Sequence, residues 1–375
     1  MNILMILSSP DKTGLTTHTL DLSSALVQLQ HKVTVLTCVD AVLNKEQVHF
    51  LRQFKQNGVN VIVKTRKNSK LSKLLVTAAF LKEIITHRWD VIHVQSPYYS
   101  FMPWILHRKF VSTLHVNDLI PCFYYKNATH LIAISKETKK FAKDIFGYSD
   151  DDITIVNHGV SLRFASELTE EESVKEKLNY NIPTDKILIG LVASIEKRKG
   201  HDILLEAIYN LPESVKSRIH VILVGSSKDG RTDGWLKDLV DKYGENRVTC
   251  VPYQDPAIFY KLFDIFVLPS RLEGFPLVVI EAMLSNCCVI RSNTEGASEQ
   301  IISEIDGFIF ENENINQLTG ILKQVIIDDS LRRKIAKAGK IKALSLFTNE
   351  TMAKNTVKVY NKIINKYQYI NYPCR

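Results

Sequence analysis

Apolar residues along the chain follow two alternating patterns, short continuous runs and longer stretches with helical spacing. The first run, Asn2–Ser8, is rich in Ile, Leu and Met, as is typical of a parallel strand covered on both faces. A loop containing Gly14, a helix with leucines along one side and a strand at Val33–Val39 follow. This order predicts a βαβ opening and an α/β fold built on a doubly wound parallel sheet.

The same alternation occurs twice along the chain. Further strands of the first series are predicted at Val59–Val63, Trp89–Val94, Phe110–Leu114, Leu131–Ser135 and Ile153–Val156. Strands of the second series are predicted at Ile187–Val192, His220–Gly225, Val248–Tyr253, Phe263–Leu268 and Cys287–Arg291. An acid-rich helical segment, Thr169–Asn181, lies between the two series and is the expected interdomain crossing. We therefore expect two domains, residues 1–165 and 166–350, followed by an amphipathic helix that starts near Thr351.

The first half also contains a strongly basic helix. Its apolar residues, which we expect to face inward, are Leu71, Leu74, Leu75, Ala78, Leu81, Ile84 and Ile85. Lys67, Lys70 and Lys73 lie on its polar flank. Residues 1–165 contain 20 Lys/Arg and 12 Asp/Glu, a net charge of +8, whereas the remaining 28 cations and 28 anions cancel. The excess positive charge of the whole chain is therefore confined to its first half.

Three explanations of this basic half remain open, namely a solvated surface, an anionic membrane and a nucleic acid. Each Lys or Arg near an anionic lipid surface contributes about 1 kcal/mol to binding. The segment Tyr98–Lys109 mixes aromatic with basic residues, which favours a membrane interface or core packing about equally. The sequence has no nucleic-acid-binding motif, so we expect no nucleic-acid partner.

Composition narrows the class of protein. A chain of 375 residues with 45% hydrophobic and 23% charged residues is typical of a folded protein with two domains. Apolar runs stay well short of the ~20 residues that span a bilayer. The six cysteines show neither metal-ligand nor disulfide-framework spacing, which indicates a reducing compartment. We expect a cytoplasmic protein, with peripheral contact on the inner face of the cell membrane.

The stretch with the clearest chemistry is Ser270–Met283, SRLEGFPLVVIEAM, which follows a predicted strand. Gly274 permits a tight turn, and Pro276 suits the first position of a helix. The first N–H groups of such a helix lack intrahelical partners. Gly274, Phe275, Pro276 and Leu277 therefore form a candidate binding site for an anion or a hydroxylated ring.

Two acids accompany this helix start. Glu273 lies in the loop and Glu281 in the helix, so at 1.5 Å per helical residue they are separated by roughly 12 Å at most. This separation is too long for a shared proton, but it matches the length of a nucleotide-sugar from hexose to ribose. The spacing predicts two carboxylates that bind hydroxyl groups of one extended ligand.

The same stretch resembles the E-x7-E signature of the retaining GT-B glycosyltransferases of family 4, in which Glu-Gly-Phe-Pro/Gly opens a helix carrying the second Glu. The resemblance implies a GT-B fold with two Rossmann-like domains facing a central cleft. It also implies that the C-terminal helix, residues 351–375, packs back onto the N-terminal, acceptor-side domain. The second domain, residues 166–350, is then the nucleotide-sugar-binding one.

The loop Ala193–Gly200, ASIEKRKG, resembles the family's G-R-L-x-x-x-K-G motif, whose Arg and Lys neutralise the β-phosphate of the donor. Lys199 and Gly200 match this motif, whereas Ser194 takes the place of the Arg. We expect Arg198 or Lys197 to supply the second cation. The loop after the first strand, which in the family approaches the diphosphate and the acceptor, contains Gly14.

Other loops resemble the family more loosely. Ser112–Asp118, STLHVND, resembles the strand-end T-x-H motif, which implies that His115 faces the donor sugar and assists catalysis, with Asp118 as a candidate to orient it. His93 is interpreted as structural. In the segment that resembles V-I-P-N-G-V-D, His158 replaces the usual Asn.

Three further features belong to the expected nucleotide site. Gly225 ends a strand beside it, and Tyr253 is a candidate to stack on the base. The loop Thr294–Gln300, TEGASEQ, resembles a weakened form of the family's G-G-x-P-E loop.

The resemblance implies a retaining, metal-independent hexosyl- or N-acetylhexosaminyltransferase without a cofactor. Lys199 and loop amides would stabilise the leaving phosphate, Glu281 would hold the ribose and Glu273 the hexose, and His115 would position it. The expected partners are a nucleotide-sugar, a UDP-sugar being favoured, and a lipid-linked or cell-surface glycan precursor of lipopolysaccharide or capsule.

Alternatives stay open at this stage. A Rossmann dehydrogenase is disfavoured because neither half has G-x-G-x-x-G after its strand. A non-catalytic GT-B partner subunit would explain Ser194 and the weakened glycine loops. A sugar-nucleotide epimerase on the same fold would need acid and base groups near the sugar carbons.

Overall fold

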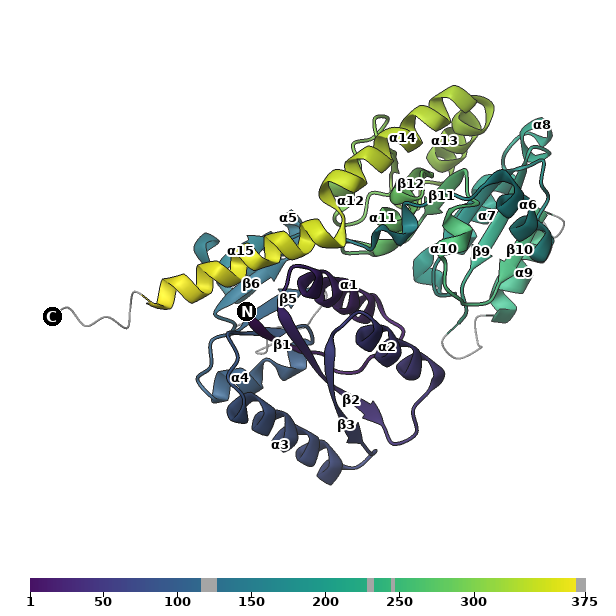
Figure 1. Cartoon of the computed structure of the whole chain (residues 1–375). Helices are drawn as coiled ribbons and strands as arrows, with labels where there is room; N and C mark the ends of the chain where they lie inside the picture. Colours follow the sequence, from purple (N-terminus) through teal and green to yellow (C-terminus); the bar gives the residue numbers. More distant parts are fainter. Residues whose placement is uncertain (116–126, 228–232, 244–246, 369–375) are drawn as a thin grey trace. The chain divides into compact units, whose positions relative to one another are not determined.

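The computed structural model describes residues 1–115, 127–227, 233–243 and 247–368 (Figure 1). The chain divides into two compact units, and each is built on a parallel sheet. The first comprises Met1–Ser161 and Phe347–Arg375, and the second Leu162–Leu346. The acid-rich segment forms α6 (Glu170–Asn179) within the second unit, so the change of unit precedes it.

The first unit has a seven-stranded sheet in the order β3-β2-β1-β4-β5-β6-β7. Its strands are β1 (Asn2–Ile6), β2 (Lys32–Asp40), β3 (Asn60–Arg66), β4 (Val91–Val94), β5 (Val111–Leu114), β6 (His130–Ala133) and β7 (Ile153–Ile155). Its α-helices are α1 (Gly14–Gln28), α2 (Lys45–Gln56), α3 (Lys70–Thr86), α4 (Phe101–Ile105), α5 (Lys136–Phe146) and α15 (Asn349–Gln368). The order of the strands reverses between β1 and β4, the switch point at which doubly wound sheets bind ligands.

Helix α15 completes the core of the first unit. Its buried Met352, Ala353, Val359, Tyr360 and Ile363 pack in one cluster with residues of α1, β1 and β2. The chain enters this helix through a backbone ladder in which the Val160 amide donates to the Phe347 carbonyl and the Asn349 amide to the Val160 carbonyl, both at 2.9 Å.

The second unit has a six-stranded sheet in the order β10-β9-β8-β11-β12-β13. Its strands are β8 (Ile187–Val192), β9 (Ile219–Val224), β10 (Val248–Val251), β11 (Ile265–Leu268), β12 (Cys288–Ser292) and β13 (Phe308–Phe310). Besides α6, its α-helices are α7 (His201–Tyr209), α8 (Glu213–Lys216), α9 (Asp233–Tyr243), α10 (Ala257–Tyr260), α11 (Leu277–Leu284), α12 (Ala297–Gln300), α13 (Ile315–Ile327) and α14 (Asp329–Leu346). The switch point lies between β8 and β11, and the loops after these strands both reach it.

The prediction of which residues of α3 face inward is wrong in part. Leu71, Leu74 and Leu75 are 67, 65 and 61% exposed, and Ala78 and Ile85 are exposed as well. Val76, Phe80 and Ile84 instead form the buried stripe, because their i, i+4 spacing places them on the side that packs against the sheet. Among the described residues, no helix has both the length and the apolar character needed to cross a membrane.

Candidate functional site

The switch point of the second unit brings together the two loops that the sequence singles out. Lys199 lies in the loop after β8 and Glu273 in the loop after β11. The Lys199 ammonium nitrogen is 2.5 Å from Glu273 Oε1, and the two side chains are only 15% and 10% exposed. Because the pair is shielded from water, its attraction is stronger than that of a surface ion pair.

A second cation stands beside this pair. Arg198 Nη1 donates to the Leu272 carbonyl at 3.0 Å and lies 3.9 Å from Glu273 Oε1. Ser194 is half-buried at the start of the same loop. A guanidinium is therefore present in this loop although Ser194 replaces the arginine of the family motif.

Arg271 fixes the two loops to each other, a role that the sequence motifs do not reveal. Its guanidinium donates to both carboxylate oxygens of Asp202 at 3.0 Å and to the Lys197 carbonyl at 2.6 Å. It also donates to Glu313 at 2.6 Å. The residue lies inside the stretch Ser270–Met283, but the sequence alone does not indicate which carboxylate it binds.

The loop Thr294–Gln300 supports the start of α11. Gln300 Nε2 donates to the Pro276 carbonyl at 3.0 Å, and the fully buried Arg291 donates to Gln300, to Thr294 and to the Glu295 carbonyl. Gly296 has φ +70°, and a Cβ there would lie 2.6 Å from the Gly274 carbonyl oxygen. The two loops thus touch where only glycine fits.

The start of helix α11 is the position that the sequence predicts to bind an anion. At Pro276, the N-cap of α11, no side chain among the described residues caps the helix. Leu277 begins the helix and is half-buried, whereas Phe275 and Pro276 are buried. The first N–H groups of α11 can therefore donate hydrogen bonds to an anion or to a hydroxyl oxygen.

Glu281 has surroundings different from those of Glu273. It is 6% exposed, and burial raises its pKa to about 7, although the neighbouring Tyr260 hydroxyl and Arg163 guanidinium partly counteract this rise. The negative charge of Asp255 also raises the pKa of Glu281. Burial therefore favours the protonated form of Glu281 more than water does.

Three predicted binding residues have simpler positions. Gly225 directly follows β9, and its amide donates to the Val251 carbonyl at 2.9 Å. Tyr253 follows β10, is 45% exposed and is held through its amide by Ser226 Oγ at 3.0 Å. Gly14 is the first residue of α1, and a Cβ there would meet no atom within 4 Å. Packing therefore does not require glycine at position 14.

In the first unit, His115 follows β5 and lies at the end of a buried polar chain. Its Nε2 is 3.1 Å from Gln95 Oε1. His93, which the sequence indicates as structural, is fully buried and bonds Tyr360 and Thr113 at 2.7 Å each. Burial lowers the pKa of His93 to about 3, so it is neutral. Asp118 lies outside the described residues.

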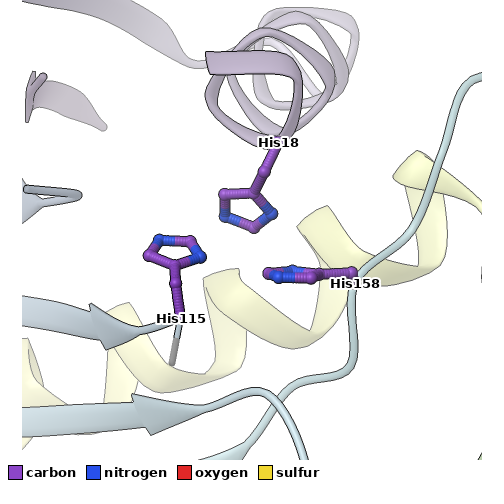
Figure 2. Close-up of side chains that lie close together, drawn as sticks. All are labelled: His18, His115 and His158. Atoms are coloured by element: carbon purple, nitrogen blue, oxygen red, sulfur yellow. The ribbon is translucent and has the colours of Figure 1, made fainter. Parts of the chain in front are cut away.

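Two other histidines lie close to His115. His18 from α1 and His158 from the loop after β7 extend toward it (Figure 2), and their ligand nitrogens all lie within 4.8 Å of one another. His18 was missed from the sequence, where it is one polar residue in an amphipathic helix, and His158 was noted only as a substitution.

Comparison with known proteins identifies the family. The model of the glycosyl transferases group 1 matches residues 173–342, and the model of glycosyltransferase family 4 matches residues 12–164. The chain belongs to this family of transferases, and its two parallel-sheet units have the GT-B fold.

Two curated relatives and one solved structure illustrate the family. The capsular polysaccharide biosynthesis glycosyltransferase CapM of Staphylococcus aureus is 26% identical over 64% of this chain and 63% of its own length. The N,N'-diacetylbacillosaminyl-diphospho-undecaprenol alpha-1,3-N-acetylgalactosaminyltransferase of Campylobacter jejuni is 25% identical over 64% of this chain and 62% of its own length. Anabaena HepE, solved in complex with UDP-glucose, superposes with a TM-score of 0.81 at 20% identity, covering 96% of this chain and 99% of HepE.

Proposed function

We propose that this chain is a retaining, metal-independent glycosyltransferase. It moves a hexose or N-acetylhexosamine from a nucleotide-sugar, a UDP-sugar being favoured, to a hydroxyl group of a lipid-linked or cell-surface glycan precursor. The observation that carries the proposal is the shielded Lys199–Glu273 pair at the switch point of the second unit. HepE with bound UDP-glucose and the relative that acts on an undecaprenol-linked sugar support the donor and acceptor classes.

The leaving group determines the roles in the second unit. As the bond from the sugar C1 to the diphosphate oxygen breaks, negative charge grows on the phosphate. Lys199, Arg198 and the first amides of α11 stabilise that charge, which is the part that other enzymes assign to a metal ion. Glu273 is then released from Lys199 and accepts hydroxyl groups of the hexose. The acceptor oxygen bonds to C1 on the same face, and its proton passes to the departing phosphate.

Glu281 and Tyr253 bind the nucleoside in this proposal. The Glu281 carboxyl accepts the ribose hydroxyls, and the half-exposed Tyr253 ring stacks on the base. Hydroxyl donors favour the charged form of a carboxyl group, so donor binding lowers the pKa of Glu281 from about 7 and releases a proton.

A panel of radiolabelled UDP- and GDP-sugars, with and without lipid-linked acceptors, tests the reaction. We expect transfer, or donor hydrolysis without acceptor. Lys199→Ala should lower kcat about 10²- to 10³-fold, the loss typical of a group that stabilises charge in the transition state. Glu281→Ala should mainly raise the KM for the donor. Lys216→Ala, which breaks a different lysine–glutamate pair in the same unit, is the control and should change neither constant.

The same panel separates the alternatives. Appearance of the epimeric donor would support an epimerase, and binding without turnover would support a non-catalytic subunit. A Lys199→Ala protein with normal kcat would contradict the assigned chemistry.

We also propose that the first unit docks on an anionic membrane through a surface formed by Leu71, Leu74, Leu75, Ile85, Trp104 and Ile105. These residues are 42–67% exposed on α3 and the adjoining α4. Lys67, Lys70 and Lys73 stand at the N-terminal end of α3. Apolar side chains beside lysines match the boundary between acyl chains and acidic headgroups.

Sedimentation with lipid vesicles tests this docking. The wild-type chain should bind vesicles containing phosphatidylglycerol more tightly than pure phosphatidylcholine, and high salt should weaken the binding. The triple variant Leu71→Ser/Leu74→Ser/Leu75→Ser should lose at least tenfold in affinity. A control with Leu178, Ile302 and Ile341 replaced by Ser removes three exposed apolar residues of the second unit and should bind normally. Equal losses in both variants would show that the α3–α4 surface is not the docking site.

A further inference from the structure

The three imidazoles of the first unit lie where a metal ion would need them. Each comes from a different element, α1, the end of β5 and the loop after β7, and Figure 2 shows the rings directed toward one another. Ring centroids are 4.8 Å apart for His18 and His115, 4.3 Å for His18 and His158, and 5.3 Å for His115 and His158. Such convergence of three polar rings is costly inside a protein unless their nitrogens find partners.

His18 has the strongest need for a partner. It is 4% exposed, and neither of its ring nitrogens has a hydrogen-bond partner within the described part of the chain. An unprotonated ring nitrogen of His18 offers its lone pair to an ion between the three rings.

His115 carries the hydrogen bond that metal-binding histidines usually make. Its Nε2 faces Gln95 Oε1 at 3.1 Å, and because a carbonyl oxygen can only accept, Nε2 bears the proton. Nδ1 then holds the lone pair. Gln95 in turn lies 3.3 Å from His93, which Tyr360 and Thr113 fix. An outer partner of this kind sets the tautomer and the orientation of a ligating imidazole.

The three ligand nitrogens are somewhat farther apart than the ligands of a bound divalent cation, so binding requires the rings to move closer together. The ligand nitrogens all lie within 4.8 Å of one another. With bonds of 2.0–2.1 Å and tetrahedral angles, three imidazole nitrogens around Zn²⁺ are about 3.4 Å apart. Rotation of the rings can supply this difference, because no hydrogen bond from the described residues holds either ring nitrogen of His18 in place.

We propose that His18, His115 and His158 bind one divalent transition-metal ion, with Zn²⁺ as the best-matched candidate. Three neutral imidazoles are the ligands that Zn²⁺ and its neighbours in the first transition row prefer over Mg²⁺ or Ca²⁺. The fourth coordination position is left to water. Lys199, Glu273 and Glu281 do not belong to this site, and metal binding can be measured without the transfer reaction.

Direct metal binding by the full chain tests the proposal. After chelator treatment, calorimetric titration with Zn²⁺ should show one ion per chain with micromolar or tighter affinity. Co²⁺ should give the intense visible bands of a four-coordinate site. His18→Asn and His158→Asn should each weaken Zn²⁺ binding at least tenfold. His49→Asn and His87→Asn, which replace exposed histidines of the same unit, should leave it unchanged.

Three results would overturn the proposal: no stoichiometric Zn²⁺ binding, binding retained in both cluster variants, or a Co²⁺–thiolate charge-transfer band showing that cysteines bind the ion. Circular dichroism of the metal-free variants checks their fold. If a variant does not fold, wild-type crystals soaked in Zn²⁺ decide the matter. An anomalous peak within bonding distance of the three nitrogens supports the site, and its absence there contradicts it.

Discussion

Glu281 shows how burial sets the properties of a single residue. Its carboxyl group ordinarily titrates at 4.5, but burial raises the pKa to about 7 in the folded chain. Between these values the folded state holds a proton that the unfolded state has lost. The stabilisation from this proton is complete below pH 4.5 and disappears as the pH rises to 7.

Replacing Glu281 by Gln should therefore stabilise the second unit more at high pH than at low pH. A shift from 4.5 to about 7 corresponds to about 3 kcal/mol at about 1.4 kcal/mol per pKa unit. The free energy of unfolding of Glu281→Gln relative to wild type should thus be higher by up to this amount at pH 8 than at pH 5. Urea unfolding followed by the fluorescence of Trp235 measures it, with the exposed Glu304→Gln as control. If the difference in unfolding free energy between Glu281→Gln and wild type did not change with pH, the raised pKa of Glu281 would be contradicted.

The site residues differ in how far the sequence could reveal them. Lys199 and Glu273 belong to motifs with a recognisable order, and the parallel sheet brings their loops together. Arg271 and His18 could not be found in this way, because their partners are tens of residues distant in the chain. A long-range contact of one polar side chain leaves no periodic signal.

Helices α3 and α15 both have apolar residues at helical spacing, but these residues differ in burial. In α3 several leucines face outward, because the sheet covers only the stripe of Val76, Phe80 and Ile84. In α15 the apolar stripe is buried against α1 and the sheet. Periodicity thus predicts that a helix exists, but the burial of a particular leucine depends on which neighbours the fold supplies.

Tyr360 attaches α15 to the polar chain that leads to His115. Its hydroxyl is 2.7 Å from His93 Nδ1, and both groups are fully buried. Tyr360→Phe removes this partner while keeping the ring, so the first unit should lose about 1–3 kcal/mol of stability. Chemical unfolding measures the loss, and the exposed Tyr209→Phe should be neutral. Unchanged stability of Tyr360→Phe would show that the His93 nitrogen finds another partner.

At the scale of the whole molecule, the order of elements is the most predictable property. Alternating strands and helices, read twice, indicate two doubly wound sheets, and both sheets have the strand order of that class. The position of the domain change is harder to predict. A helix such as α6, with an acid-rich start and no buried residue, resembles a linker in composition although it lies in the second unit.

The first unit is made of two separate segments of the chain, Met1–Ser161 and Phe347–Arg375. Because the described part of α15 supplies five residues to the hydrophobic core of the first unit, a chain ending at Leu346 should lose cooperative folding of that unit alone. Each large side chain that is no longer buried costs roughly 1.5–3 kcal/mol, and a typical domain has only about 5–15 kcal/mol in total. The second unit has a core of its own and should unfold at its usual temperature.

Tryptophan positions make the two units distinguishable. Trp89 and Trp104 belong to the first unit and Trp235 to the second. Thermal unfolding of a Trp235→Phe chain reports the first unit, and that of a Trp89→Phe/Trp104→Phe chain reports the second. Ending the chain at Leu346 should abolish the first transition and preserve the second, whereas a chain ending at Gln368 should keep both. Loss of both transitions in the shorter chain would mean that the second unit depends on the first for its stability.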